Sequence, residues 1–426
     1  MGKIISSDQH RVPLWQPLTI RNFLLLFIGE NVSLFGDQLY LVALLWLTIQ
    51  LTNSGLSLGT VLMAAAIPRA ILILVGGVIS DRTSPRLVML GSNIVRALLM
   101  IILTVIVWEQ ATQLWHLYLF SICFGILDGF FIPAAQSIVP TLVSKEQLTA
   151  SNTLTQGTNQ LILLIGPVLG GLLIAVSGIK IAFAINAATF IFTAVTLLLM
   201  KVCFDSNTAT KIKETTTINN SPSQKFFLLI TSIREGLDYG WRNLDLRIIL
   251  LVVMMYNLIF IGPLRIGFAS LAHERFPGGA IALGIMNSAW GGGNLLGALM
   301  PPLLSNPPKI GVLLLSIAGI QGFGLLMLSF ISNITLASVI IVVLGFCSGF
   351  FVVTEITWVQ KQTPPEMLGR VMSLGVLSSF GIAPFSFALA GLLVDLNLAI
   401  LFGVTGIFMI FITALLTTNP SVRNIE

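Results

Sequence analysis

Long apolar runs alternate with short polar breaks along most of the chain. Each run reaches the roughly 20 residues that an α-helix needs to cross the hydrocarbon core of a bilayer. The pattern therefore predicts an all-α membrane protein with twelve transmembrane helices. These helices are expected at residues 20–48, 56–80, 86–108, 114–140, 150–176, 179–203, 246–272, 279–304, 309–331, 334–360, 368–394 and 396–417.

The break between the sixth and seventh runs is longer and more polar than the others. Residues 204–223 are rich in Thr, Ser, Asn and Lys, a composition that cannot bury enough apolar surface to fold by itself. Residues 224–243 mix large apolar with charged side chains, which predicts a helix lying along the membrane surface. We therefore divide the chain into an N-terminal six-helix half (1–203), a cytoplasmic linker with a surface amphipathic helix (204–245) and a C-terminal six-helix half (246–426).

The two halves share short sequence matches between positions whose numbers differ by 220. The matches are Gly129–Phe131 with Gly349–Phe351, Gly171–Leu173 with Gly391–Leu393, and Gly77 with Gly297. Each match lies at a corresponding place in its apolar run. This indicates a duplicated six-helix unit and hence two related bundles.

The charges of the loops predict how the chain is oriented. With both termini in the cytoplasm, seventeen of the 22 Lys and Arg residues lie on the inner side and only Lys180 and Arg275 on the outer side. Cytoplasmic loops of membrane proteins carry such an excess of Lys and Arg. We expect a multi-pass protein of the plasma (inner) membrane with both termini cytoplasmic.

Composition supports a lipid environment. Hydrophobic residues make up 55% of the chain and charged residues only 9%, whereas soluble domains carry roughly a quarter charged residues. The net charge of +5 is spread over many loops and forms no single basic patch, so a nucleic-acid partner is not expected. The expected surroundings are the lipid bilayer, and we expect a monomer.

The loop after the second run carries a recognisable motif. Residues 77–86 read Gly-Val-Ile-Ser-Asp-Arg-Thr-Ser-Pro-Arg and resemble the G-x-x-x-D-R-x-G-x-R signature of the major facilitator superfamily, with Ser84 where the family has Gly. The resemblance implies the major facilitator fold, in which two pseudo-symmetric six-helix bundles enclose a substrate site near the midplane. It also implies a cytoplasmic gate that latches the halves together. The residues assigned to this gate are Gly77, Asp81, Arg82, Arg86 and Arg370.

Other segments resemble one branch of this superfamily. Ser33–Asp37, Ser232–Leu237 and Pro365–Val371 are similar to the branch that contains macrolide-efflux and enterobactin-exporter proteins. The resemblance covers nearly the whole chain and implies export, but its motifs do not identify the cargo.

A proline and three glycines in the fifth run resemble the G-P-x-x-G-G core of antiporters in this superfamily. They are Gly166, Pro167, Gly170 and Gly171. Proline interrupts the helical hydrogen-bond ladder and glycines let another helix approach closely, so a bend and a tight interface are expected. Ordinary small-residue packing is an equally good interpretation of the same residues.

Ionisable side chains inside the predicted helices are candidates for function, because burying a charge in a membrane is costly. Glu30 and Asp37 lie two helical turns apart on one face of the first helix, and Arg69 and Asp128 lie in the second and fourth. These four are our proton-coupling or substrate candidates, with Arg69 as the charge partner of the carboxylates. The alternative is a static ion pair, such as Asp128 with Arg96, that only holds the helices together.

The resulting hypothesis is a secondary active transporter that exports an amphiphilic small molecule by alternating access, coupled to proton entry. No Gly-Lys-Ser or Gly-Lys-Thr follows the glycine-rich segment 291–293, the three histidines show no metal-ligand spacing, and no nucleophile–base pattern is present. We therefore expect no cofactor, no metal and no enzymatic activity. The C-terminal half offers polar and aromatic side chains for the solute, namely Asn257, Asn287, Trp290, Phe350, Phe351 and Trp358.

Three alternatives stay open. The cargo could be a siderophore, for which accessible cavity arginines are expected, or a lysolipid, for which a lateral opening is expected. From a different class, the chain could be a non-transporting membrane receptor or enzyme.

Overall fold

The computed structural model describes residues 13–80, 84–201, 241–301, 309–364, 371 and 381–418, and the regular elements in these ranges are helices. In the first half they are η1 (Gln16–Thr19), α1 (Arg21–Thr52), α2 (Gly55–Ser80), α3 (Pro85–Trp108), α4 (Leu114–Leu142), η2 (Lys145–Gln147), α5 (Leu148–Ser177) and α6 (Ile179–Leu199). In the second half they are α9 (Leu244–Gly262), η3 (Pro263–Gly267), α10 (Phe268–Glu274), α11 (Ala280–Leu299), α12 (Ile310–Leu328), α13 (Ile334–Gln362), α15 (Ala383–Leu396) and α16 (Leu398–Thr417).

Ten described helices are long and apolar enough to cross a membrane, and one of them combines α9, η3 and α10. The eighth and eleventh expected helices correspond to α11 and to the shorter α15. α11 contains Asn287, Asn294 and three consecutive glycines, which are typical of helix faces that pack on protein and not on lipid. Each predicted span therefore overlaps a described helix, although residues 372–380 of the eleventh lie outside the described part of the chain, and the prediction of a twelve-helix, all-α membrane fold is confirmed.

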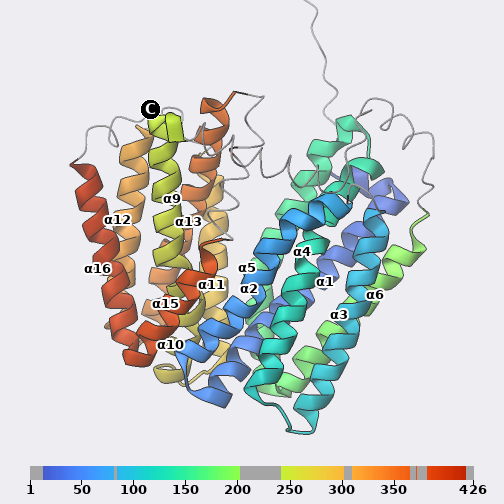
Figure 1. Cartoon of the computed structure of the whole chain (residues 1–426), viewed down its shortest axis with the longest axis horizontal. Helices are drawn as coiled ribbons and strands as arrows, with labels where there is room; N and C mark the ends of the chain where they lie inside the picture. The colour runs from blue at the N-terminus through green and yellow to red at the C-terminus, as the bar shows by residue number, and fades with distance from the viewer. Residues whose placement is uncertain are drawn as a thin grey trace, which may run out of the picture.

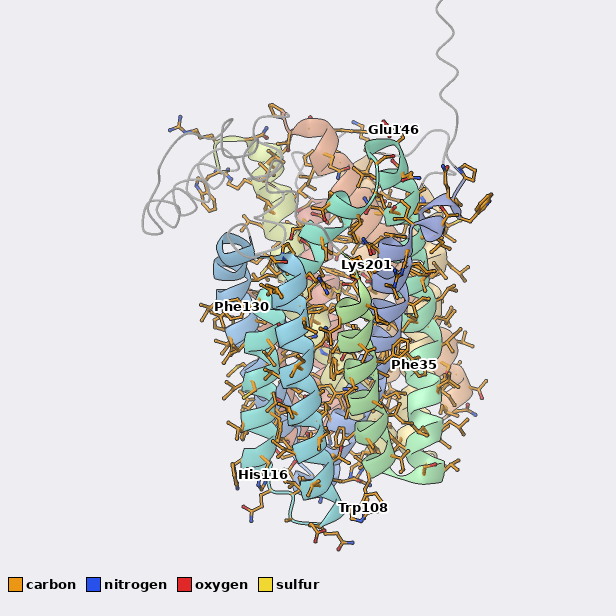
Figure 2. The ribbon with its side chains drawn as sticks, turned by 90° about the vertical axis from the view of Figure 1, so that its right-hand side faces the viewer. Phe35, Trp108, His116, Phe130, Glu146 and Lys201 are labelled. Carbon is orange, nitrogen blue, oxygen red and sulfur yellow. The ribbon has the colours of Figure 1, made fainter. Side chains whose placement is uncertain are left out.

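The helices form two groups, α1 to α6 and α9 to α16, which lie close together at one end and diverge toward the other (Figure 1). We call the end where α1 begins and α6 and α16 end the linker end, and the opposite end the far end. Figure 2 shows Glu146 and Lys201 toward the linker end and Trp108 and His116 at the far end. The predicted domain boundaries and the surface helix at 224–243 depend on residues 202–240, which lie outside the described part of the chain.

The two groups meet through two equivalent pairs of helices. Gly171 of α5 lies against Ala280 of α11, and Gly391 of α15 lies against Gly55 of α2, so closely that a side chain at either glycine would collide with the facing backbone. The residue numbers differ by 220 between the glycines and by 225 between their partners. The α5–α11 contact and the α15–α2 contact are therefore two copies of one interface, related by the internal repeat of the chain.

The same two offsets relate the contacts inside each half. Gly125 of α4 packs on the carbonyl of Ala65 in α2, and Gly345 of α13 packs on the carbonyl of Trp290 in α11. The offset is again 220 for α4 and α13 and 225 for α2 and α11. This supports the duplicated unit, but it shows that the sequence match of Gly77 (α2) with Gly297 (α11) at an offset of 220 does not join equivalent positions.

The change of offset coincides with a difference in helix length. α3 has 24 residues, whereas α12, its counterpart, has 19. The five residues by which α12 is shorter account for the fall in the offset from 225 at α11 to 220 at α13.

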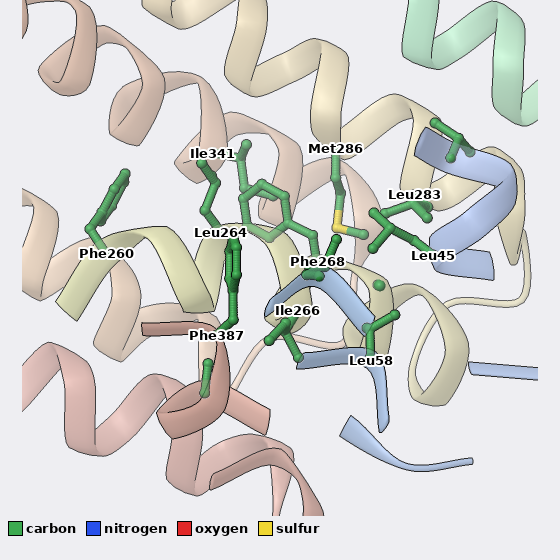
Figure 3. Close-up of a cluster of buried hydrophobic side chains, with 14 of the residues drawn as sticks. Leu45, Leu58, Phe260, Leu264, Ile266, Phe268, Leu283, Met286, Ile341 and Phe387 are labelled. Carbon is green, nitrogen blue, oxygen red and sulfur yellow. The ribbon is translucent and has the colours of Figure 1, made fainter. Parts of the chain in front are cut away.

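Buried apolar side chains from both halves form one continuous cluster. In Figure 3, Leu45 and Leu58 of the first half lie beside Ile266, Phe268 and Leu283 of the second. Many large apolar side chains also lie on the outer surfaces of the bundles, where a bilayer would cover them.

Candidate functional site

Three charged side chains meet inside the first half. The Asp128 carboxylate of α4 binds Arg69 of α2 through Oδ2 and Arg96 of α3 through Oδ1, and each N–O distance is 2.5 Å. Arg96 is only 3% exposed, against 21% for Asp128 and 31% for Arg69. One carboxylate thus binds one buried and one partly exposed guanidinium, and the three groups together carry one positive charge.

Aromatic rings complete the environment of Arg96. Its guanidinium carbon lies 4.5 Å from the ring centroid of Phe131 and 5.6 Å from that of Phe190. Cation–π contacts of this kind stabilise a cation that has lost its water. The Nε atoms of Arg96 and Arg69 are buried and have no hydrogen-bond partner among the described residues. Both arginines therefore depend on Asp128 as their anion.

Asp37 lies beside this cluster on α1. It is half-buried and interacts electrostatically with Arg96, Asp128 and Arg69, attracted by the arginines and repelled by the other carboxylate. With Asp37 ionised the four groups sum to zero charge, and with Asp37 protonated they carry one positive charge. A proton on Asp37 would therefore change the net charge of the cluster by one unit.

Glu30 is not part of the cluster. Its Oε1 atom is buried without a hydrogen-bond partner, and it forms no ion pair within the described residues. It precedes Asp37 by seven residues on the same face of α1, about 10 Å nearer the linker end at 1.5 Å per residue. The structure thus brings together Asp37, Arg69 and Asp128 of the four candidates and leaves Glu30 apart.

The gate residues of the signature loop are only partly described. Asp81, Arg82 and Arg370 lie outside the described residues, as does everything about Gly77 beyond its place in α2. Arg86, at the start of α3, donates from Nε to the Leu197 carbonyl (2.7 Å) and from Nη2 to the Leu198 carbonyl (3.0 Å). These bonds satisfy the end of α6 in the same half, so the latch between halves stays a prediction.

The proline–glycine segment of α5 lies between two neighbours. Gly166 and Gly170 face Gln38 and Leu39 of α1, whereas Gly171 faces α11. The carbonyl of Pro167 is approached by Gly284 of α11, across the interface between halves. Helix α5 continues through Pro167, and the predicted bend stays a prediction.

At the equivalent place in the second half the polar groups are neutral. Gln321 of α12 is fully buried, and its Nε2 donates to the hydroxyl of Tyr256 in α9 (2.9 Å) and to the carbonyl of Leu344 (3.2 Å). Tyr256 stacks on Phe351 of α13 with 4.5 Å between ring centroids. The sequence gives no sign of this network, because each member resembles an ordinary core residue.

An apolar cavity of about 240 Å³ adjoins Tyr256 and Phe351. Helices α9, α12, α13 and α16 form its walls. The lining residues are Ile248, Leu251, Val252, Met255, Tyr256, Ile259, Leu315, Ala318, Phe351, Met409, Ile412, Thr413 and Leu416. Of the six aromatic and polar residues suggested for the solute, Phe351 lines this cavity, whereas the other five do not.

A further cation lies near the interface of the halves. Arg265 is half-buried on η3, a π-helical turn, and is repelled by Arg69 of the other half. It forms no ion pair within the described residues. The signal in the sequence is a charged residue inside an apolar run. Across the described residues, no group of three or more His, Cys, Asp or Glu side chains could hold a metal ion.

Comparison with known proteins identifies a matching family model and relatives of similar length. The sequence model of the Major Facilitator Superfamily matches residues 26–388. Macrolide efflux protein A of Streptococcus pyogenes is 23% identical over 88% of this chain and 89% of its own length. Multidrug efflux pump Tap of Mycolicibacterium fortuitum is 22% identical over 87% and 89%. Enterobactin exporter EntS of Salmonella paratyphi A is 25% identical over 83% and 80%.

Solved structures share the fold. The nucleoside transporter NupG superposes with a TM-score of 0.70 at 15% identity, covering 92% of this chain and 96% of its own. A POT family transporter in complex with 5-aminolevulinic acid gives a TM-score of 0.68 at 15% identity, covering 98% of this chain and 100% of its own.

Proposed function

Because the chain belongs to the Major Facilitator Superfamily, we propose that this membrane transporter exports an amphiphilic small molecule by alternating access, driven by proton entry. Export is supported by the relatives, which are efflux proteins for macrolides, for multiple drugs and for enterobactin. We further propose that the linker end lies in the cytoplasm and the membrane is the plasma (inner) membrane, as the excess of Lys and Arg in the linker-end loops supports.

The proposal of proton coupling is supported by the position of Asp37 beside the Arg69–Asp128–Arg96 cluster. A proton on Asp37 adds one positive charge to a group of side chains that lie inside the spans. Electrostatic interactions are strong where water is excluded, so this change alters the energy of any rearrangement of α1 against α2 and α4. Glu30, one step toward the linker end on α1, is proposed to pass the proton between Asp37 and the cytoplasm.

The observation that supports an amphiphilic cargo is the apolar cavity of the second half. Its lining offers aromatic and aliphatic surface with the Tyr256 and Thr413 hydroxyls as polar groups, which suits an apolar body with few polar substituents. A strongly anionic siderophore is supported less well, because Arg69 and Arg96 are already bound to Asp128, which leaves Arg265 as the arginine near the interface of the halves with no ion pair within the described residues.

The test is proton-driven efflux in cells that lack their own pumps, with macrolides, dyes, siderophores and lysolipids as candidate cargoes. Under an imposed pH gradient, Asp37→Asn should abolish the proton-dependent component of efflux. Asp245→Asn is the matched control, because this carboxylate lies in the first turn of α9, away from the cluster. Proton-driven efflux that survives Asp37→Asn at the wild-type rate would rule out coupling through this residue.

A further inference from the structure

Asp395 joins the two halves at the far end. It lies near the end of α15, and its carboxylate accepts hydrogen bonds from the first turn of α2 in the other half. Gly55 N donates to Oδ1 (2.5 Å), Leu56 N donates to Oδ2 (3.2 Å), and the Ser54 hydroxyl donates to Oδ2 (2.9 Å).

This contact supplies hydrogen-bond acceptors and negative charge to a helix N-terminus. The first N–H groups of a helix have no partner within it, and the aligned peptide dipoles give that end a partial positive charge. A carboxylate satisfies both, and a side chain at the N-cap can satisfy further N–H groups. In α2 the Ser54 hydroxyl accepts from Ser57 N (3.2 Å) and leaves the N–H groups of Gly55 and Leu56 to another partner. In α2 the anion is supplied by a residue 340 positions away.

The contact belongs to a group of inter-half contacts confined to the far end. The His273 Nε2 lies 3.0 Å from Asn53 Oδ1, and the ring of Trp46 packs on Gly279. Toward the linker end the two groups of helices diverge (Figure 1). The bonds of Asp395 therefore exist only while the far ends are together.

We propose that Asp395 is a positioning residue of the transport cycle, which holds the far ends together by capping α2. When the halves rock apart at the far end, the first turn of α2 loses this anion and must bind water. The inference rests on the alternating-access part of the proposed function and is independent of the cargo and of the coupling ion.

The carboxylate contact of Asp395 is not repeated at the position related to it by internal symmetry. The position equivalent to Asp395 at an offset of 220 is Ala175, which has no carboxylate and lies one turn beyond Gly171, the residue of α5 that packs on the start of α11. Removing the Asp395 carboxylate should therefore leave the α5–α11 contact unchanged while weakening the α2–α15 contact.

The experiment measures distances between spin labels on the purified full-length protein, with the three native cysteines replaced. One pair, Ala111→Cys with Ser332→Cys, reports on the far end, and another, Thr149→Cys with Lys361→Cys, reports on the linker end. Each residue is exposed, and each pair joins the two halves. Because loss of a helix cap changes an equilibrium by a factor of roughly 2–30, Asp395→Ala should raise the population with separated far ends by a factor in that range. Asp395→Asn should give a smaller increase.

Asn397→Ala is the matched control. Asn397 Oδ1 accepts from Ala399 N (2.7 Å) and caps α16 within the same half, two residues from Asp395. It should lower thermal stability without changing the far-end distances. The inference is overturned if Asp395→Ala leaves the distribution as in wild type, or if Asn397→Ala shifts it equally. Alternating access itself would be overturned by a different result. Each of the two label pairs would then keep a single distance in all variants, at every pH and at every drug concentration.

Discussion

The two halves have the same packing of glycines on neighbouring backbones but different polar centres. At equivalent positions the first half has charged and the second half neutral side chains. The equivalent pairs are Arg69 with Asn294, Arg96 with Gln321 and Asp128 with Ser348. The difference shows that the charges are not required by the helix packing, since the second half forms the same contacts without them. We infer that they are retained for coupling, while the second half supplies surface for the cargo.

The largest expected effect follows from removing the shared anion. Asp128→Asn removes the carboxylate that binds both Arg69 and Arg96, and breaking a buried ion pair costs about 3–5 kcal/mol. We expect a large fall in the melting temperature of the detergent-solubilised protein and loss of proton-driven transport. Ser348→Ala, at the equivalent position, should cost at most about 1 kcal/mol. Equal losses in the two variants would contradict the division of roles.

The next effect separates stability from coupling. The triple variant Arg69→Asn, Arg96→Gln, Asp128→Ser copies the second half into the first, removes all three charges of the ion-paired cluster and leaves Asp37 as the only titratable group of the four. Removing a whole buried ionic group avoids the cost of an uncompensated charge, so melting should recover much of the loss seen in Asp128→Asn while proton-driven transport stays absent. A triple variant that transports as wild type does would show that the charges are merely structural.

A smaller effect is expected in the apolar cavity. Ala318→Leu adds side-chain volume to its wall, and changes of this size in an apolar pocket alter recognition by about 1–3 kcal/mol. The apparent affinity for a bulky cargo should fall roughly tenfold or more, with proton coupling intact and stability nearly unchanged. Phe411→Leu, on the exposed face of α16, is the control. An unchanged affinity for every transported compound would exclude the cavity from recognition.

The smallest effect tests the symmetry of the interface. Ala175→Asp places a carboxylate at the start of α11, where Asp395 lies in the equivalent contact with α2. An acidic group near a helix N-terminus contributes about 0.3–1 kcal/mol, so the far-end labels should shift modestly toward the short distance. A shift toward the long distance would show that the two interfaces are not equivalent.

Much of the fold could be predicted because it depends on local composition. Apolar runs determine the spans, and the matches around Gly129 and Gly349 reveal the repeat. The contact of Asp395 with Gly55 could not be predicted, since nothing local relates positions so distant in the chain. The candidate site was predicted only in part, because its contacts also join helices that are distant in the sequence. A charge inside a span is visible in the sequence, but whether Arg96 or Glu30 joins Asp128 depends on how the helices are rotated.

The unequal lengths of α3 and α12 have a consequence for the surrounding membrane. At 1.5 Å per residue, 24 residues extend about 36 Å and 19 residues about 28 Å, so the two flanks of the molecule present apolar belts of different height. Lipids must stretch beside one flank and compress beside the other, or the protein must tilt, and each response has an elastic cost. Bilayer thickness thus becomes a variable that acts differently on the two halves, and lipids of graded chain length should tune their balance.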